Sequence, residues 1–182
     1  MIIKNKIIFF TIVSGFIFSC NMNKKESEID FIKVFDLNKK IEIELPSNWH
    51  KEFNTTGFSS GIIASEMTGE ILNTIVINAN WNEDNVFVNS HLENIIDSLN
   101  KTVGLNTKIS KTGKMNNNRA CFNFSNGFDT LTDLNRNQFL YILNSDSVKG
   151  HILFTATIYG DSIQESQSEL IAEIVKSIKM KK

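Results

Sequence analysis

Ser59 is the residue whose type and setting most directly suggest catalysis. Gly57-Phe58-Ser59-Ser60-Gly61 satisfies the G-x-S-x-G pattern of a nucleophile elbow, in which a sharp turn from a strand into a helix exposes a serine hydroxyl near a histidine. His91 or His151 would then be the general base. The surroundings do not suit this role, because a largely polar stretch precedes Gly57 and a strand pattern follows Gly61. We interpret residues 57–61 as part of a Ser/Gly-rich loop and keep a serine hydrolase as the alternative function.

The histidines and the acidic residues show no spacing typical of a metal site. His50, His91 and His151 do not form an H-x-x-x-H pattern. Asp129 and Asp133 share one segment, but the alternating oxygen ligands and the glycine of a calcium loop are missing there. The chain also has no glycine-rich phosphate-binding pattern. The sequence therefore predicts no metal, no cofactor and no catalytic residue.

Cys20 is the residue for which the sequence predicts a covalent modification. Ile17-Phe18-Ser19-Cys20 resembles a bacterial lipobox, with an aliphatic residue three positions before the cysteine and a small residue directly before it. In such a motif the cysteine becomes the new N-terminus and carries the lipid, which supplies affinity for the membrane. We therefore expect lipidation at Cys20.

The segments on either side of Cys20 support this interpretation. Residues 1–19 have the organisation of a secretory signal peptide, with Lys4 and Lys6 followed by an apolar run. That run is about a dozen residues long, whereas a membrane-spanning helix needs roughly 20. Residues 20–30 are polar and are expected to form a flexible tether. The predicted location is the cell envelope, where the protein is lipid-anchored and faces the periplasm or the surface.

Charge and cysteine content exclude some classes of partner. Removing residues 1–19 removes Lys4 and Lys6 but no acid, so the net charge changes from −1 to −3. This balance does not suggest binding to nucleic acid. Cys121 is the only other cysteine, and it has no disulfide partner if Cys20 carries lipid. We expect Cys121 to be a buried small side chain rather than a reactive nucleophile.

Apolar periodicity divides residues 31–182 into strands and helices. Alternation predicts strands over residues 31–37, 40–45, 61–67, 71–81, 104–115, 119–127, 138–143 and 151–159. Residues 54–61 and 129–137 are expected to be loops, and residues 116–118 a turn. Trp49, three positions after the only proline, Pro46, is expected to fold back onto the core.

Two segments have the period of an amphipathic helix. Residues 88–101 form the first, with Ser90 and Glu93 placed as a capping box. Asp161 or Ser162 would cap the second. Their apolar stripes are Val88, Leu92, Ile95, Ile96 and Leu99 in the first helix, and Ile163, Leu170, Ile171, Ile174 and Ile178 in the second.

The order of these elements predicts an α+β fold. A mostly antiparallel sheet of about six to seven strands would be packed by the two helices. Residues 31–182 resemble the Mog1/PsbP-like family in the early hairpin ending in Leu45-Pro46-Ser47-Asn48-Trp49, the mid-chain helix, and the last helix with Ile174-Val175-Lys176-Ser177-Ile178. The resemblance implies one α/β/α domain over residues 31–182. It implies no site residue, because this fold hosts several functions.

These observations together predict a membrane-anchored envelope lipoprotein with a non-catalytic binding or accessory role. Its partner would be an unknown envelope protein or a small ligand bound through the sheet face or the loops. No catalytic acid, base or nucleophile emerges with suitable neighbours, so we expect that the protein is not an enzyme.

Overall fold

The computed structural model describes residues 29–66 and 70–181 of the chain. Cys20 and the predicted signal peptide lie outside these residues. Within them the chain forms strands and helices in the order β1 (Phe31–Phe35), β2 (Ile41–Pro46), β3 (His50–Thr55), β4 (Ser59–Ser65), β5 (Ile75–Asn82), α1 (Ser90–Thr102), β6 (Leu105–Met115), β7 (Asn118–Asp129), β8 (Leu134–Ser145), β9 (Val148–Tyr159), α2 (Glu165–Ser177) and β10 (Lys179–Met180). Neither of these helices is long and apolar enough to cross a membrane.

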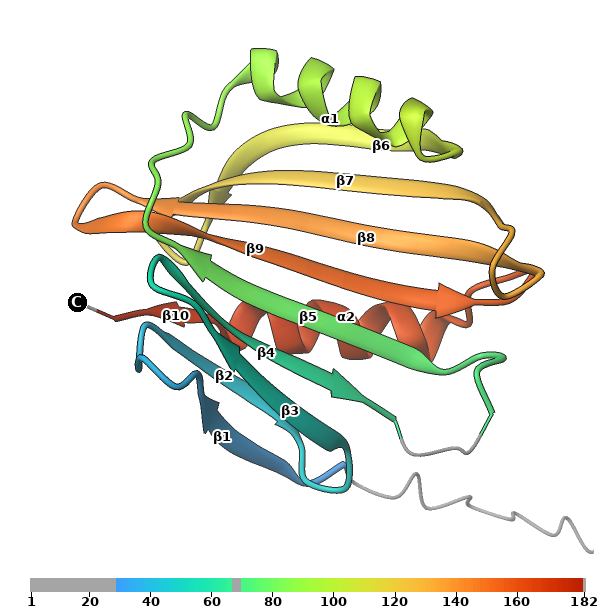
Figure 1. Ribbon diagram of the computed structural model, residues 1–182, viewed down its shortest axis with the longest axis horizontal. Helices are drawn as coiled ribbons and strands as arrows, with labels where there is room; N and C mark the ends of the chain where they lie inside the picture. Colours follow the sequence, from blue (N-terminus) through green and yellow to red (C-terminus); the bar gives the residue numbers. More distant parts are fainter. Residues whose placement is uncertain (1–28, 67–69, 182) are drawn as a thin grey trace, which may run out of the picture.

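The strands form two antiparallel sheets. The larger has seven strands in the order β3-β4-β5-β9-β8-β7-β6, and the smaller has three in the order β1-β2-β10 (Figure 1). The long hairpins of β6 to β9 follow the chain order, whereas β9 pairs with β5 across the intervening helix and hairpins. The predicted α+β class with a mostly antiparallel sheet is therefore confirmed.

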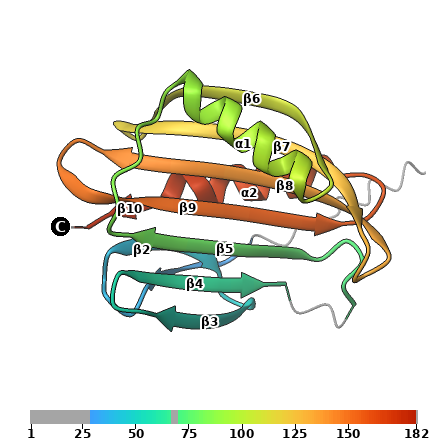
Figure 2. The ribbon, with the colours of Figure 1, turned by 45° about the horizontal axis from the view of Figure 1, so that its top comes forward.

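The larger sheet is covered differently on its two faces. Helix α2 and the small sheet pack on one face, which we call the α2 face, and α1 lies on the opposite α1 face (Figures 1 and 2). The main core fills the α2 face and contains Ile43 of β2, Ile77 of β5, Phe154 of β9 and Ile174 of α2. A smaller cluster lies under α1 and includes Leu92, Ile96 and Cys121.

The clearest alternating strands bury the faces that their sequences predict. In β5 the side chains of Ile75, Ile77, Ala79 and Trp81 are buried, while those between them are only partly covered. Strand β9 follows the same rule with Ile152, Phe154, Ala156 and Ile158. Trp49 is also buried, which confirms that it folds back onto the core.

Strand β7 buries its more polar face. Ala120, Phe122 and Phe124 do share a face opposite Cys121, Asn123 and Ser125, but the second, more polar set is the one that is fully buried. Helix α1 covers this set, while Phe122 and Phe124 remain partly exposed. The polar face of β7 is therefore an internal surface.

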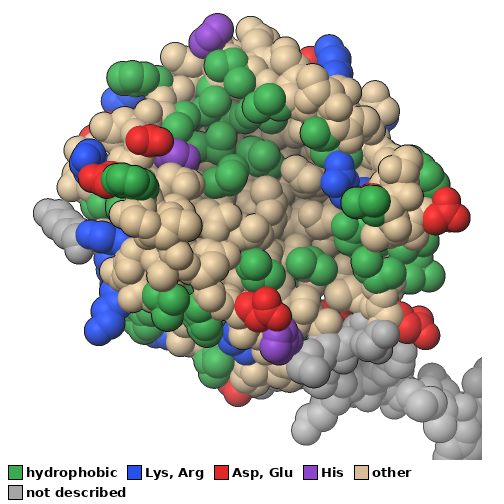
Figure 3. Space-filling view, viewed as in Figure 1, with side chains coloured by type: hydrophobic (Ala, Val, Ile, Leu, Met, Phe, Trp, Pro, Cys, Tyr) green, Lys and Arg blue, Asp and Glu red, His purple; other side chains and the backbone are tan. Residues whose placement is uncertain are grey.

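The apolar stripe of α1 is only partly used for this packing. Leu92 and Ile96 are buried, whereas Ile95 and Leu99 are exposed. Figure 3 shows the α1 face, with apolar side chains gathered in the upper part, where α1 lies. The helix is also capped by Asn89, whose side chain accepts a hydrogen bond from the Leu92 N–H, and not by the predicted Ser90.

The N-cap of the second helix and the bounds of two loops also differ from the prediction. Helix α2 begins after Gln164, which exchanges capping bonds with Gln167, so neither Asp161 nor Ser162 is its cap. The predicted loop over residues 54–61 is a tight turn between β3 and β4. The predicted loop over residues 129–137 is shorter, because β7 extends to Asp129 and β8 begins at Leu134. The predicted turn after Met115 is confirmed, with positive φ at Asn116 and Asn117.

Candidate functional site

Ser59 does not lie in a nucleophile elbow. It is the first residue of β4 and follows a turn from β3, so residues 57–61 connect two strands of a hairpin rather than a strand and a helix. Its hydroxyl lies 2.7 Å from that of Thr56 within the same turn. The strained strand-to-helix turn that exposes a catalytic serine is therefore not formed at this position.

The two candidate bases are not placed to activate Ser59. Ser59 pairs with Asn82 of β5, and Asn82 pairs with His151 of β9, so Ser59 and His151 share a face but lie two strand spacings apart, about 10 Å. A general base needs to lie within hydrogen-bond reach or one water molecule of its nucleophile. His91 is exposed on the first turn of α1. The geometry of these residues does not support the hydrolase alternative.

The contacts of His50 and the burial of Cys121 are those of structural residues. His50 lies 3.0 Å from Glu52 at the exposed end of β3. The part of the chain that the structure describes contains no group of three or more His, Cys, Asp or Glu side chains that could hold a metal ion. Cys121 is buried under α1, and burial raises the pKa of its thiol to about 11. A thiol in this state is a poor nucleophile.

The connection between β5 and α1 is a surface segment that several side-chain contacts hold in place. Residues 83–89, which we call the Phe87 loop, run beside the turn between β8 and β9. Lys149 forms an ion pair with Glu83 at 2.7 Å, and the pKa of Glu83 is lowered by this hydrogen bond. The Nδ1 atom of His151 lies 2.7 Å from the carbonyl oxygen of Asp84, and since a carbonyl only accepts, Nδ1 carries the proton.

Two further contacts hold the same loop. The Gly150 N–H donates to the side chain of Asn85 at 3.2 Å, and the Asn144 amide donates to the carbonyl oxygen of Val86 at 2.5 Å. Four consecutive loop residues are therefore tied to β8 and β9. The next residue, Phe87, is 81% exposed. The loop thus presents a large aromatic side chain on a fixed backbone.

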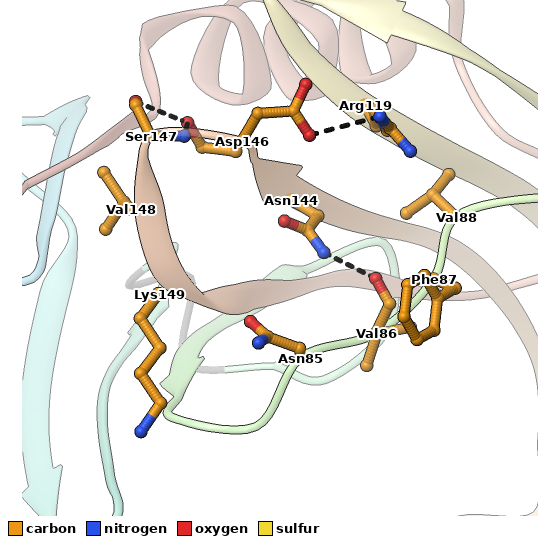
Figure 4. A pocket seen from close by; sticks show the side chains of 11 residues that line it. Asn85, Val86, Phe87, Val88, Arg119, Asn144, Asp146, Ser147, Val148 and Lys149 are labelled. Carbon is orange, nitrogen blue, oxygen red and sulfur yellow. Dashed lines mark hydrogen bonds and ion pairs between the residues drawn. The ribbon is translucent and has the colours of Figure 1, made fainter.

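A hollow of about 420 Å³ lies between the Phe87 loop and the turn that joins β8 to β9 (Figure 4). It is lined by residues 85–88 on one side and by residues 144–149 on the other, with Arg119 at its edge. Arg119 lies 3.3 Å from Asp146, so its charge is balanced locally. The hollow combines amide groups, two paired cations, Arg119 and Lys149, and apolar side chains.

Sequence reasoning did not single out this surface. Its only local signal is the break in the strand pattern at residues 82–85, because the residues that hold the loop come from β8 and β9, about 60 positions later in the chain. Cys20, the predicted lipidation site, lies outside the described residues.

Comparisons with known proteins agree with this arrangement of elements. The Ran-binding protein Mog1p of Saccharomyces cerevisiae matches over 84% of this chain and 96% of its own, with a TM-score of 0.56 and 8% sequence identity. A mutant of Mog1 matches with the same values. A protein from Bacteroides thetaiotaomicron, 12% identical, gives a TM-score of 0.49 over 82% of this chain and 48% of its own.

The sequence comparisons give no further relative. No family model matches the chain, and no curated protein matches it. At 8% identity the likeness to Mog1p concerns the fold alone. The antiparallel sheet between α1 on one face and α2 on the other, together with this likeness, shows that the chain has the Mog1/PsbP-like fold.

Proposed function

We propose that the protein is a membrane-anchored lipoprotein of the bacterial cell envelope with a non-catalytic role, and that it binds a partner protein through the Phe87 loop. The main support for this binding site is that Phe87 is exposed on a loop that β8 and β9 hold in place. Rigidly held aromatic side chains are typical anchors of protein interfaces. Yeast Mog1p, which has the same fold, is a Ran-binding protein, which is consistent with a binding role but carries no partner across.

A protein partner suits this surface better than a small ligand. Sites for small molecules are mostly apolar clefts that bury most of the ligand. The hollow beside Phe87 has the volume of such a site, about 420 Å³, but charged and amide side chains line much of it. An exposed aromatic residue beside a polar rim is instead the pattern of a protein interface.

Cross-linking in the living bacterium tests the binding site. A photo-reactive phenylalanine analogue replaces Phe87 in one strain and Leu131 in another, because Leu131 is 95% exposed in the turn between β7 and β8 at the opposite end of the sheet. We expect a defined protein adduct only from position 87. No adduct from position 87, or the same adduct from both positions, would contradict the proposal.

The partner identified in this way allows a quantitative check. Phe87→Ala should weaken binding of the purified partner roughly 30-fold, the effect of losing an interface anchor worth about 2 kcal/mol. Its free energy of unfolding should change by less than about 0.5 kcal/mol, because the side chain is exposed. Unchanged affinity would remove Phe87 from the interface.

The anchor is tested independently of the binding site. The proposed lipid on Cys20 is supported by the sequence motif that ends in Ile17-Phe18-Ser19-Cys20. In the Cys20→Ala variant we expect the protein to remain unprocessed or to be released in soluble form, since the lipid would supply the affinity for the membrane. Metabolic labelling with a fatty acid measures this. Label that persists on the Cys20→Ala variant would refute lipidation at this residue.

A further inference from the structure

Strand β6 forms an open edge of the seven-stranded sheet, with β7 as its only strand neighbour among the described residues. Residues 111–114 are exposed along this edge. Because Met115 and Asn118 close a two-residue turn, the alternate residues Ser110, Thr112 and Lys114 direct their N–H and C=O groups away from β7. No backbone hydrogen bond joins these outward groups to another described residue.

A small apolar hollow of about 250 Å³ lies directly beside this edge, on the α2 face. Ala120, Phe122 and Tyr141 form its floor, and residues 111–115 form its rim. The rings of Phe122 and Tyr141 are 4.8 Å apart. The hollow is open at Gly113, where an added Cβ would meet nothing within 4 Å. One apolar side chain of a neighbouring strand would fit there.

The charge along the edge has one sign. Lys108, Lys111 and Lys114 are all exposed, and none of them forms an ion pair with a residue that the structure describes. The Lys111 ammonium lies 5.7 Å from the centre of the Phe122 ring, at the rim of the hollow. Lys114 shares its face with Thr112, whose partner Cys121 lies beneath α1. Lys111 on the α2 face and Lys114 on the α1 face therefore each place a positive charge beside the edge, with no acidic partner among the described residues.

We propose that β6 is a docking edge for an extended, acidic segment of a partner protein. The segment adds as a further strand beside residues 110–114 and satisfies their outward backbone groups. One of its apolar side chains enters the hollow at Gly113 and packs on Phe122 and Tyr141. Its acidic side chains face the lysines. This surface is separate from the Phe87 loop, so the inference does not depend on the function proposed above.

A second copy of this chain does not fit the same edge. Two β6 strands paired with each other would bring the lysines of both copies onto one short edge, with no acidic residue in β6 to balance them, and like charges close together destabilise a sheet. The other edge of the sheet, β3, lacks the same features, because it is shorter and Lys51 donates there to the carbonyl oxygens of Ser47 and Trp49. The observations therefore favour an acidic strand at β6.

Fluorescence anisotropy with the purified full chain in detergent tests the proposal. The probe is a labelled peptide of about nine residues that alternates glutamate with valine and has one central phenylalanine. Gly113→Val places a branched side chain in the hollow, where an added Cβ meets nothing within 4 Å, and should weaken binding at least about tenfold. Thr112→Pro removes an outward N–H while keeping the pairs with β7, and should have the same effect. Gly57→Val, at another glycine with open space around it, is the matched control and should bind normally.

Two altered probes separate strand addition from nonspecific attraction. Replacing each glutamate with lysine should abolish binding, and methylating alternate backbone nitrogens should weaken it at least about tenfold. Binding should also fall as salt is raised. The proposal is overturned if the wild-type chain fails to bind the acidic probe, or if Gly113→Val or the methylated probe binds as tightly as its parent. Circular dichroism verifies that each variant is folded.

Discussion

At the scale of single residues, Cys121 shows how burial controls chemistry. Its side chain is fully covered by α1, and burial, with a smaller effect of the Glu93 charge, raises the thiol pKa to about 11. Only the thiolate reacts readily, so at pH 8 roughly one thiol in a thousand would be reactive even if a reagent could reach it. We predict that Cys121 in the folded Cys20→Ala chain does not react with Ellman's reagent at pH 8 and reacts quickly in urea.

Absorbance at 412 nm measures this reaction. Circular dichroism under the same conditions establishes that the chain stays folded in buffer. Reaction of Cys121 within minutes in the folded protein would mean that α1 opens frequently, and the helix would then be a mobile cover instead of a fixed part of the fold.

Asn100 and Asn123 show why some interior residues escape sequence reasoning. They are 4% and 0% exposed, and the Asn100 amide donates to Asn123 at 2.9 Å and to Thr107 at 3.0 Å. Asn100 follows Leu92 and Ile96 at intervals of four, so it lies on the buried stripe of α1. A polar residue in a sequence suggests solvent, and its burial becomes favourable only when a partner from another element satisfies it.

At the scale of elements, β10 is held to β2 by charge as well as by strand pairing. Glu42 of β2 is 6% exposed and lies 3.1 Å from Lys179, with Lys181 bound to its second oxygen. The hydrogen bond from Lys181, followed by the one from Lys179, lowers the Glu42 pKa from 4.5 to about 2. A carboxylate with a lowered pKa in the folded state stabilises the protein above its ordinary pKa and loses this contribution as the pH falls toward 2.

Thermal melts between pH 2 and pH 7 test this contribution. We predict that Glu42→Gln lowers the melting temperature most above about pH 5, and that the two melting curves converge near pH 2. Glu83→Gln is the matched control, since its pair with Lys149 is more exposed and should matter less. A constant difference between wild type and Glu42→Gln across this range would show that the ionisation of Glu42 does not stabilise β10.

Strands that bury one complete face could be predicted from the sequence, whereas elements that depend on residues distant in the chain could not. Strands β5 and β9 could be predicted because each buries one complete face. Strand β3 was missed because it is an edge strand with largely exposed side chains, and so its sequence does not alternate. Strand β10 has two residues and exists only through its pairing with β2. The Phe87 loop likewise depends on distant residues, so the sequence shows only a break in the strand pattern at residues 82–85.

At the scale of the whole molecule, two separate sheets enclose one core. The turn after β1 is tied to the large sheet by Asp36, which is buried and accepts hydrogen bonds from the Ile41 N–H at 2.5 Å and from the Ser60 hydroxyl. Helix α2 covers the rest of this face of the large sheet, beside the small sheet (Figure 2). The predicted sandwich of helices around a sheet is therefore correct, but the small sheet shares the covering of the core with α2.

Helix α2 is the apolar cover that the core loses when the chain is shortened. Helix α2 buries Ile171, Ile174 and Val175, and Ile178 follows them into the core. A fully buried aliphatic side chain contributes roughly 1.5–3 kcal/mol, so these residues together rival the whole stability of a domain, about 5–15 kcal/mol. We predict that a chain ending at Gly160 is insoluble or unfolded, because the α2 face would lose its cover.

A second truncation separates the helix from the strand that follows it. A chain ending at Ile178 keeps α2 but loses β10 and both lysines that bind Glu42. It should remain folded and melt at a lower temperature than the full chain, since strand pairing and two ion pairs are lost while the apolar core stays covered. Urea melts and circular dichroism measure both chains. If the chain ending at Gly160 stays soluble and melts cooperatively near the full-length temperature, α2 is not required for folding, and its apolar side must be available to bind a partner.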